Sequence, residues 1–492
     1  MSPRPLIAAL VASLSLGMPR AQTLPDLGDI SSATLSEQQE RTIGNRIMRE
    51  VYNDPAYVDD PELTDYVTSV GQRLLAVADN PPRDMTYFVV RDDSVNAFAL
   101  VGGHIGIHTG LITLTQNESE LAGVMAHETG HILQKHQARF IHDASHAQWT
   151  SLAALALAVL AARSGSNQGA QVSEAAITAA GALQMQNQIN FTRENEREAD
   201  RVGFQLLSRS GYDPRGMQTF FERMLRANRL NEFKTIPSYF RTHPLTTERI
   251  AEMADRAERL PGVMYGVNSA DSMEYRIMKA KVMAQSGSAT EAVTLFRTLL
   301  EDETVVRPRE NVYGLAYALR RAHDFEGAWK TLQPIRTGSS HPAFELLAGE
   351  ILADMHKGDE AIAVYRAALK ANPGYRALAY AYLDGLLQSG HPKEVLTDLE
   401  DRLRARPDDW RLYELQSRAY QATGRNISQH RAQAEAYYRR DNLAAAVDQL
   451  EIAVKQTRGS DFYEMSMAES RLRELRAQLE IQKAAEKALK IS

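Results

Sequence analysis

Two histidines flank a glutamate in the segment His127-Glu128-Thr129-Gly130-His131. Residues four apart lie on the same face of an α-helix, so both imidazoles can bind one metal ion at about 2.0–2.1 Å. Glu128 would then lie beside the metal without binding it, where a carboxylate can take a proton from water. The spacing predicts a hydrolytic metal site with His127 and His131 as ligands and Glu128 as general base.

The surrounding sequence predicts one helix over residues 115–139. Asn117, with Glu120 three residues later, resembles a capping box. An apolar stripe at helical spacing consists of Leu121, Val124, Met125, Ile132 and Leu133. The two histidines lie off this stripe and can face a cleft. Gly130 costs about 1 kcal/mol relative to alanine inside a helix, which favours close packing there. A pair of structural histidines is the alternative to a metal site.

The composition excludes several classes of chemistry. The 492 residues include no cysteine, which excludes disulfides, thiolate catalysis and cysteine-bound zinc, and leaves His, Glu and Asp as metal ligands. The net charge of −6 and the lack of a basic stripe argue against a nucleic-acid partner. The length predicts two or three domains.

The N-terminus is expected to direct export. Arg4 precedes a short apolar run over residues 6–18, and Ala21 offers a small residue at a possible cleavage point. The run is too short for a membrane-spanning helix. We predict a signal peptide over residues 1–21; a buried N-terminal helix is the alternative.

Residues 85–114 change to a strand-like pattern in which Gly102-Gly103 marks a turn or a close backbone approach. This sheet would end just before the histidine helix, so an edge strand there could bind an extended peptide by β-addition. The candidate substrate-binding residues are Asn96, Phe98, Gly102 and Gly103.

Histidine is concentrated in this region, with seven of the thirteen between residues 104 and 146. Gln134 and Gln137 stand where a longer H-E-x-x-H-x-x-G-x-x-H zinc motif needs glycine and histidine, so that metalloprotease class is excluded. The remaining histidines are expected around the site or on the surface: His104, His108, His136, His142 and His146.

The apolar segment over residues 151–190 consists of two alanine-rich runs separated by a Gly/Ser/Asn-rich stretch. Neither run reaches the roughly 18–20 residues of a membrane-spanning helix. We expect a buried helical hairpin, or alternatively a lid or an element in peripheral contact with a membrane.

A charged helix over residues 192–204 offers a third metal ligand. Glu196 and Asp200 are four apart and share a face. One carboxylate could bind the metal while the other orients a histidine or assists at the transition state. Spacing alone does not choose among Glu194, Glu196 and Glu198, and a solvated charged helix is the alternative.

The histidine motif and the Glu196–Asp200 pair together resemble the M48 family of zinc metallopeptidases. The resemblance implies one zinc ion held by His127, His131 and Glu196. It implies that Glu128 is the general base and that Asp200 is a proton donor or a supporting residue. The strand region around residues 96–103 also resembles the segment before that family's zinc helix.

The resemblance extends to His243-Pro244 and Arg249, because soluble family members usually carry a similar His-Pro segment with a downstream arginine. His243 could reach zinc as a regulatory fourth ligand and produce a self-inhibited resting state, or it could simply stand at the entry to a helix. Arg249 could stabilise the developing oxyanion, or it could pair with Glu196 or Asp200.

From about residue 268 the sequence changes to helical repeats. Equivalent positions recur 36, 33 and 34 residues apart at Ala292, Ala328, Ala361 and Val395. This is the period of tetratricopeptide repeats, which bind partners on a concave surface. A scaffold that only covers the protease domain is the alternative. A charged amphipathic helix over residues 468–490 is expected to cap the array.

We therefore expect a zincin-like (gluzincin) α+β metalloprotease domain over residues 22–267, mostly helical with a small sheet, and an all-α tetratricopeptide-repeat solenoid over residues 268–492. This order resembles that of periplasmic M48 proteins of Gram-negative bacteria. The resemblance implies a periplasmic endopeptidase that degrades misfolded or stalled outer-membrane protein precursors and assists their assembly, with the repeats docking on the assembly machinery. A chaperone or adaptor with latent proteolysis is the main alternative, and a zinc hydrolase of small substrates is a weaker one.

Overall fold

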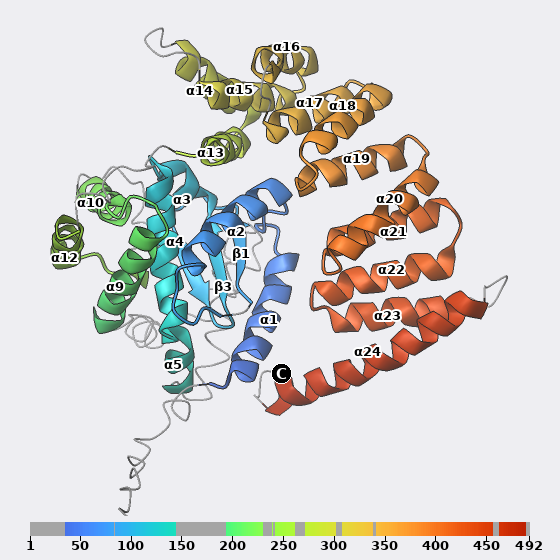
Figure 1. Cartoon of the computed structure of the whole chain (residues 1–492), viewed down its shortest axis with the longest axis horizontal. Coiled ribbons are helices and arrows are strands. Elements are labelled where there is room, and N and C mark those ends of the chain that lie inside the picture. Colours follow the sequence, from blue (N-terminus) through green and yellow to red (C-terminus); the bar gives the residue numbers. More distant parts are fainter. Residues whose placement is uncertain are drawn as a thin grey trace, which may run out of the picture.

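The computed structural model describes residues 35–82, 84–143, 193–229, 239, 242–260, 271–301, 308–337, 341–455 and 462–488. It confirms the expected fold class, a mostly helical domain with a small sheet followed by an all-α array (Figure 1). The predicted signal peptide, the apolar segment over residues 151–190 and the predicted domain boundary lie outside the described residues. Within the described ranges, no helix has the length and apolar character needed to cross a membrane.

Three strands form the sheet: β1 (Thr86–Val90), β2 (Ala97–Leu100) and β3 (His104–His108). Their order is β1-β3-β2. Central β3 pairs in parallel with β1 and antiparallel with β2. One side of β2 therefore pairs with β3, and the other side is the edge of the sheet that adjoins the histidine helix.

Helices cover both faces of the sheet. Because successive side chains of a strand point to opposite faces, β1 directs Tyr87 and Val89 into the main core. On this face lie α2 (Pro61–Leu75) and α4 (Glu118–Leu133). The next side chains in register, Phe88 and Val90, contact α1 (Glu37–Asn53) on the other face. The sheet thus has a core on each side, and α4 lies against its β2 edge.

The single helix predicted over residues 115–139 is wrong, because the chain forms α4 and then α5 (His136–Asp143), with the short α3 (Thr109–Leu114) before them. Asn117 caps α4 as predicted, since its side chain accepts a hydrogen bond from the backbone N–H of Glu120. The break lies at Lys135, whose φ of 53° is left-handed and turns the chain out of the helix. Apolar periodicity does not reveal such a turn at a residue other than glycine.

Three further helices complete the part of the chain that holds the site: α9 (Arg193–Arg209), α10 (Gly216–Arg229) and α12 (Thr247–Glu258). Figure 1 shows them on the side of this domain that faces away from the later repeats. α9 runs along α4, and α10 packs near the N-terminal end of α4, where Gly123 approaches the backbone of Met217.

The second half of the described chain consists of paired helices. They are α13 (Met273–Gln285), α14 (Ala289–Glu301), α15 (Arg309–Arg321), α16 (Phe325–Arg336), α17 (Pro342–Asp354), α18 (Gly358–Ala371), α19 (Arg376–Gln388), α20 (Pro392–Ala405), α21 (Trp410–Ala422), α22 (Asn426–Arg439), α23 (Leu443–Val454) and α24 (Phe462–Ala488). The four equivalent positions found in the sequence all lie buried on the second helix of a pair. The long α24 includes most of the predicted capping segment.

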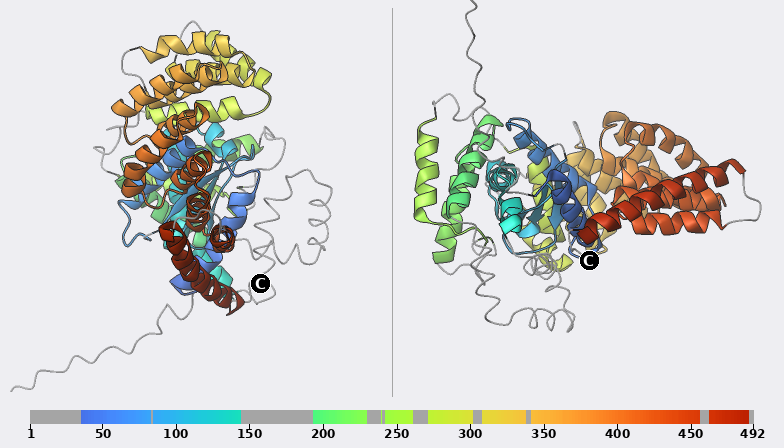
Figure 2. Two further views of the ribbon diagram at one scale, coloured as in Figure 1. Left: turned by 90° about the vertical axis from the view of Figure 1, so that its right-hand side faces the viewer. Right: turned by 90° about the horizontal axis from the view of Figure 1, so that it is seen from below.

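The paired helices curve around the first domain until α24 returns to α1 (Figures 1 and 2). Arg49 of α1 closes the curve by pairing with Asp441 at 2.8 Å and Glu486 at 2.6 Å. The main hydrophobic core continues from α2 and α4 into α13, α15 and α17. The helical array therefore shares its first core with the metal-binding half instead of forming a separate body.

A buried lysine joins the two halves where α2 begins. Lys281 of α13 lies 2.5 Å from both Asp60 and Glu62, and the hydroxyl of Tyr375 at the start of α19 also contacts Glu62. Burial alone would raise the pKa of Asp60, but Lys281 and two backbone N–H groups outweigh this effect and lower it. The buried charges of Asp60 and Glu62 keep all their partners only while α2, α13 and α19 stay together.

We predict that Lys281→Met lowers the free energy of unfolding by about 3–5 kcal/mol, because it leaves two carboxylates buried without their cation. Denaturant unfolding of the full chain measures this loss. Lys483→Met is the control, since it removes an exposed pair with Glu480 and should change stability little. Equal effects of the two substitutions would contradict a role for the buried cluster.

Candidate metal centre

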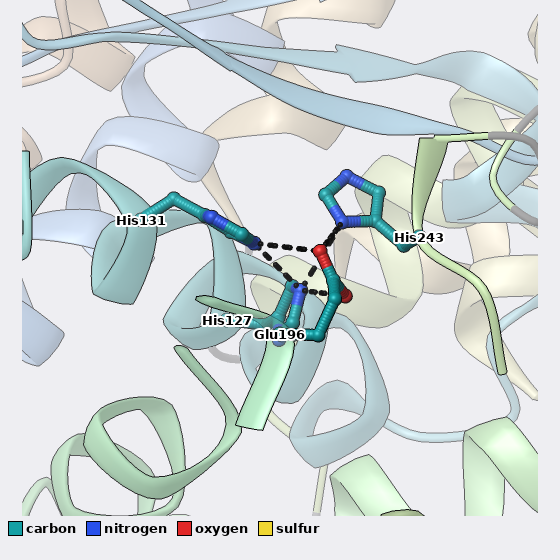
Figure 3. Close-up of side chains that lie close together, drawn as sticks. All are labelled: His127, His131, Glu196 and His243. Carbon is teal, nitrogen blue, oxygen red and sulfur yellow. Dashed lines mark hydrogen bonds and ion pairs between the residues drawn. The ribbon is translucent and has the colours of Figure 1, made fainter. Parts of the chain in front are cut away.

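Four buried side chains from three parts of the chain converge at one point (Figure 3). His127 and His131 come from α4, Glu196 comes from α9, and His243 comes from the turn before α12. One donor atom from each lies within 4.8 Å of the other three. The structure thus places Glu196 at this point; of the other candidate carboxylates, Glu194 is exposed and Glu198 contacts His136.

The distances between the donor atoms fit a zinc ion. The Nε2 atoms of His127 and His131 are 3.1 Å apart, and they lie 3.5 and 3.4 Å from the Glu196 carboxylate. The Nδ1 atom of His243 is 3.3 Å from His127 Nε2 and 3.1 Å from Glu196 Oε1. A tetrahedron with zinc–ligand bonds of 2.0–2.1 Å has edges of about 3.3 Å. Nitrogen and carboxylate donors are also the ligands that zinc accepts.

Two glycines allow α4 and α9 to touch through their backbones. A Cβ atom on Gly130 would lie 2.8 Å from the carbonyl oxygen of Ala199, and one on Gly203 would lie 2.9 Å from the backbone nitrogen of His127. The close packing predicted for Gly130 is therefore packing against a backbone. It brings Glu196 within reach of both histidines.

Asp200 and Arg249 contact the candidate metal ligands on the side away from the metal position. Asp200 Oδ1 lies 2.9 Å from His127 Nδ1. Arg249 holds the same carboxylate with two hydrogen bonds of 2.7 and 2.8 Å and lies 2.9 Å from Glu196 Oε2. The guanidinium thus pairs with both carboxylates, which was one of the two expectations for Arg249.

The pKa values show how the buried charges balance without metal. Burial disfavours a charged His127, but hydrogen bonds to Asp200 and Glu196 outweigh it and raise the pKa of His127 to about 9. Burial lowers the pKa of His131 to about 3, so this imidazole is neutral. Burial would raise the pKa of Glu196, but His243 and the two other histidines hold it well below its usual range. A metal ion that binds here displaces the proton of His127.

Glu128 is buried beside the donor set, with Oε1 3.4 Å from His243 Nε2. Its oxygens make no well-formed hydrogen bond with the described residues, although the backbone N–H of Ala99 faces the carboxylate. Burial raises its pKa, and a raised pKa makes a carboxylate a stronger base.

His243 stands between Glu128 and Glu196 and completes the group of four donors. Its backbone N–H donates to the carbonyl of Tyr239 at 2.8 Å, and the two rings lie 4.8 Å apart between centroids. Arg249 donates to the carbonyl of Pro244 at 2.7 Å. Thr246 caps α12, so His243 is not the helix-entry residue of the alternative interpretation.

The pairing register of β2 decides which of its backbone groups face away from β3. The carbonyl of Asn96 accepts a hydrogen bond from His108. Since bonding alternates along an antiparallel pair, Phe98 also bonds to β3. The backbone groups of Ala97 and Ala99 point away from β3; Ala97 is fully buried there, and the carbonyl of Ala99 accepts a hydrogen bond from Gln137 Nε2 at 3.4 Å. The sequence predicts that hydrogen bonding alternates along an edge strand. It does not predict which residues face the edge, because that depends on the pairing register of β2 and β3.

The four residues first predicted for this surface lie in or next to β2. The ring of Phe98 packs against Phe88 on the α1 face, with 5.9 Å between centroids. The Asn96 side chain is buried. Gly102 and Gly103 form the turn between β2 and β3, each with a φ of 86° that favours glycine.

Of the five neighbouring histidines, three have side chains that the structure describes. His104 and His108 are buried on β3, where burial lowers the pKa of each to about 4. His136 is also buried, and its Nδ1 lies 2.8 Å from Nδ1 of the metal-site residue His131. The side chain of His142 and the whole of His146 lie outside the described residues.

A histidine pair on one helix, a carboxylate from a second helix and a buried glutamate beside them define a zincin-type metallopeptidase. Residues 61–257 match the sequence profile of Peptidase family M48. The chain is 33% identical to the "Beta-barrel assembly-enhancing protease" of Escherichia coli (strain K12), over 92% of each chain. It is 29% identical to the protein of the same name from Yersinia pestis, over 90% of this chain and 92% of the relative.

A shorter match joins the chain to a eukaryotic relative. The "Mitochondrial metalloendopeptidase OMA1" of Schizosaccharomyces pombe is 30% identical over 39% of this chain and 52% of its own length. The chain belongs to peptidase family M48. It is a zinc metallopeptidase, as the sequence predicted.

We predict that Gly203→Ala destabilises the protein by about 1–3 kcal/mol through overpacking, although alanine is favoured by about 1 kcal/mol inside a helix. The added methyl group must separate α9 from α4, so bound zinc should also fall. Thermal unfolding and metal analysis measure the two effects. Gly374→Ala is the matched control, because no atom lies within 4 Å of its Cβ position. A Gly203→Ala protein with normal stability and zinc would contradict the backbone contact.

Proposed function

We propose that this protein is an exported, periplasmic zinc endopeptidase in which His127, His131 and Glu196 bind the metal. The observation that carries the proposal is their convergence: the two Nε2 atoms are 3.1 Å apart, and each lies 3.4–3.5 Å from an oxygen of the Glu196 carboxylate. Buried Glu128 lies next to them on the same helix as both histidines. No other side-chain role needs to be assumed for hydrolysis.

A bound zinc ion would acidify a water molecule and polarise the scissile carbonyl. Glu128 takes the proton of the water, and burial, which raises its pKa, favours its protonated form. It then gives the proton to the leaving amine. Asp200 acts as a supporting residue, since His127 and Arg249 together engage its carboxylate.

The proposed substrate is an extended polypeptide paired with the edge of β2. The backbone groups of Ala97 and Ala99 face away from β3, and Ala99 lies beside Glu128. A substrate would have to uncover buried Ala97 and displace Gln137 from the Ala99 carbonyl. Backbone pairing tolerates many sequences, which suits an enzyme acting on misfolded or stalled outer-membrane protein precursors. The names of the bacterial relatives support this substrate class.

The repeats are proposed to be tetratricopeptide repeats that dock on the outer-membrane assembly machinery. Their period and helical pairing support this assignment. An open cavity of about 810 Å³ lies between the start of α2 and helices α13, α15, α17, α18, α19 and α21. Its charged lining includes Asp59, Glu350, Asp384, Arg411 and Glu414. The repeats thus retain an accessible surface although α1 and α2 lie inside their curve.

We predict that Glu128→Gln retains about one zinc ion per chain and loses cleavage of an unfolded outer-membrane β-barrel protein by about 10²–10⁴-fold. The substitution keeps the shape of the side chain and removes its basicity. Metal analysis and a cleavage assay on the same preparation test it. Cleavage at the wild-type rate would contradict the assignment of the base.

We also propose that His243 keeps the resting enzyme closed. Its Nδ1 lies among the three other donor atoms, and its Nε2 lies near Glu128. In this position it fills the fourth ligand position that catalysis needs open. Opening requires the segment with His243 and Pro244 to leave the site.

His243→Ala should retain zinc and cleave faster, roughly tenfold if the closed state is favoured by about 1.4 kcal/mol. Initial rates of cleavage at equal zinc content are the measurement. The control is His391→Ala, which removes an exposed histidine that makes no capping hydrogen bond. Unchanged activity of His243→Ala would contradict the closed resting state.

A second function, as a chaperone or adaptor with latent proteolysis, is favoured by the same closed site and by the open cavity in the repeats. Complementation of a strain lacking the protein with the Glu128→Gln variant separates the two functions. Restored assembly of outer-membrane proteins would show that binding is sufficient, whereas failure with normal protein levels would show that cleavage is required.

A further inference from the structure

We propose that His136 and Glu198 form a hydrogen-bonded relay that positions the zinc ligand His131. The inference rests on the proposed role of His131 and adds two positioning residues to it. His136 lies on α5 beyond the helix that carries the zinc motif, and Glu198 lies 62 residues further along the chain. Neither residue belongs to the group of four donors.

The contacts form one continuous line. His131 directs Nε2 to the metal site and Nδ1 to His136, and the Nδ1 atoms of the two rings are 2.8 Å apart. On the far side of the second ring, His136 Nε2 lies 3.2 Å from Glu198 Oε2. Both histidines are completely buried, whereas the Glu198 side chain is 35% exposed.

Zinc binding fixes the direction of every hydrogen bond in this line. A histidine that binds metal through Nε2 carries its proton on Nδ1. His131 must therefore donate to His136, whose Nδ1 must accept. The proton of neutral His136 is then on Nε2 and is donated to Glu198. The negative carboxylate is thereby connected to a metal ligand through an intervening imidazole.

The turn at Lys135 builds this arrangement. In a continuous helix, about 3.6 residues per turn would place His136 on a different face from His131. The left-handed φ of 53° at Lys135 instead ends α4, and a new helix starts at His136. Lys135 Nζ lies 3.6 Å from Glu40 Oε1 of α1. A left-handed backbone is unfavourable for lysine. In this protein the turn at Lys135 places His136 where it contacts His131.

The two zinc-site histidines are therefore supported differently. His127 contacts Asp200 directly, and Arg249 locks that carboxylate in the interior. His131 reaches its carboxylate only through His136, and that carboxylate is partly in water. The contact chain from His131 to its carboxylate is longer and more exposed to water than the direct contact between His127 and Asp200. Its loss should weaken zinc binding without removing a ligand.

Competition with a chromophoric zinc chelator tests the relay on the full chain. His136→Phe keeps an aromatic ring but no acceptor, and we expect a 10–100-fold weaker zinc affinity. Glu198→Ala should lose up to about tenfold. Because Glu198 acts through His136, the double variant should be no weaker than His136→Phe alone. Glu194→Ala, an exposed residue of the same helix, is the control and should bind zinc normally.

His136→Asn provides the rescue, because its Oδ1 can accept from His131 where Nδ1 of histidine did. It should recover most of the affinity and make zinc binding insensitive to Glu198→Ala. Normal affinity in both His136→Phe and Glu198→Ala would overturn the relay, as would losses that multiply in the double variant. Thermal unfolding of the zinc-free proteins checks the fold; if His136→Phe is unfolded, the Glu198→Ala and His136→Asn comparisons decide.

His131→Ala in the same titration separates this inference from the proposed metal site. Loss of zinc in His131→Ala together with normal binding in the relay variants would leave the ligand assignment intact and exclude the relay. Full zinc binding by His131→Ala would instead remove the ligand assignment, and the relay would be excluded with it.

Discussion

The backbone contact between α4 and α9 determines whether the metal centre can exist. The zinc motif and the third donor lie more than sixty residues apart, and nothing local holds them together. Gly130 and Gly203 remove the side chains that would keep the helices apart. The helices then approach so closely that Glu196 reaches Nε2 of both histidines. Helical geometry provides the first two donors, and only tertiary packing provides the third.

The same packing creates an electrostatic requirement that the rest of the site satisfies. Glu128, Glu196 and Asp200 are all nearly inaccessible to water, and isolated buried carboxylates are strongly unfavourable. Arg249 compensates two of them and also binds the carbonyl next to His243. Glu128 is the exception, since its carboxylate has the fewest partners among the described residues of the site. Burial raises the pKa of this carboxylate despite the nearby histidines, which suits the proposed proton transfer.

The sequence predicted those features that depend on local spacing. The positions of His127 and His131 on one helix follow from a four-residue interval, and the cap at Asn117 follows from its side-chain chemistry. Spacing could not choose among three glutamates on α9, because the choice depends on how that helix is rotated against α4. The edge groups of Ala97 and Ala99 depend on the register of β2, and the contact of His136 depends on an unusual backbone angle at Lys135. These features arise only when distant segments pack.

The arrangement around Glu128 connects substrate binding with release of the closed state. The Ala99 N–H faces this carboxylate from the strand edge, and His243 Nε2 lies 3.4 Å from it. A peptide paired with β2 would bring its carbonyl towards the space that His243 occupies, so the proposed substrate and the closed segment compete. Binding energy along the strand must therefore exceed the free energy that holds His243 in place. An extended chain has free backbone groups to pair with β2, whereas a folded protein has few. The closed site would therefore make the proposed enzyme prefer unfolded polypeptides, independently of their side chains.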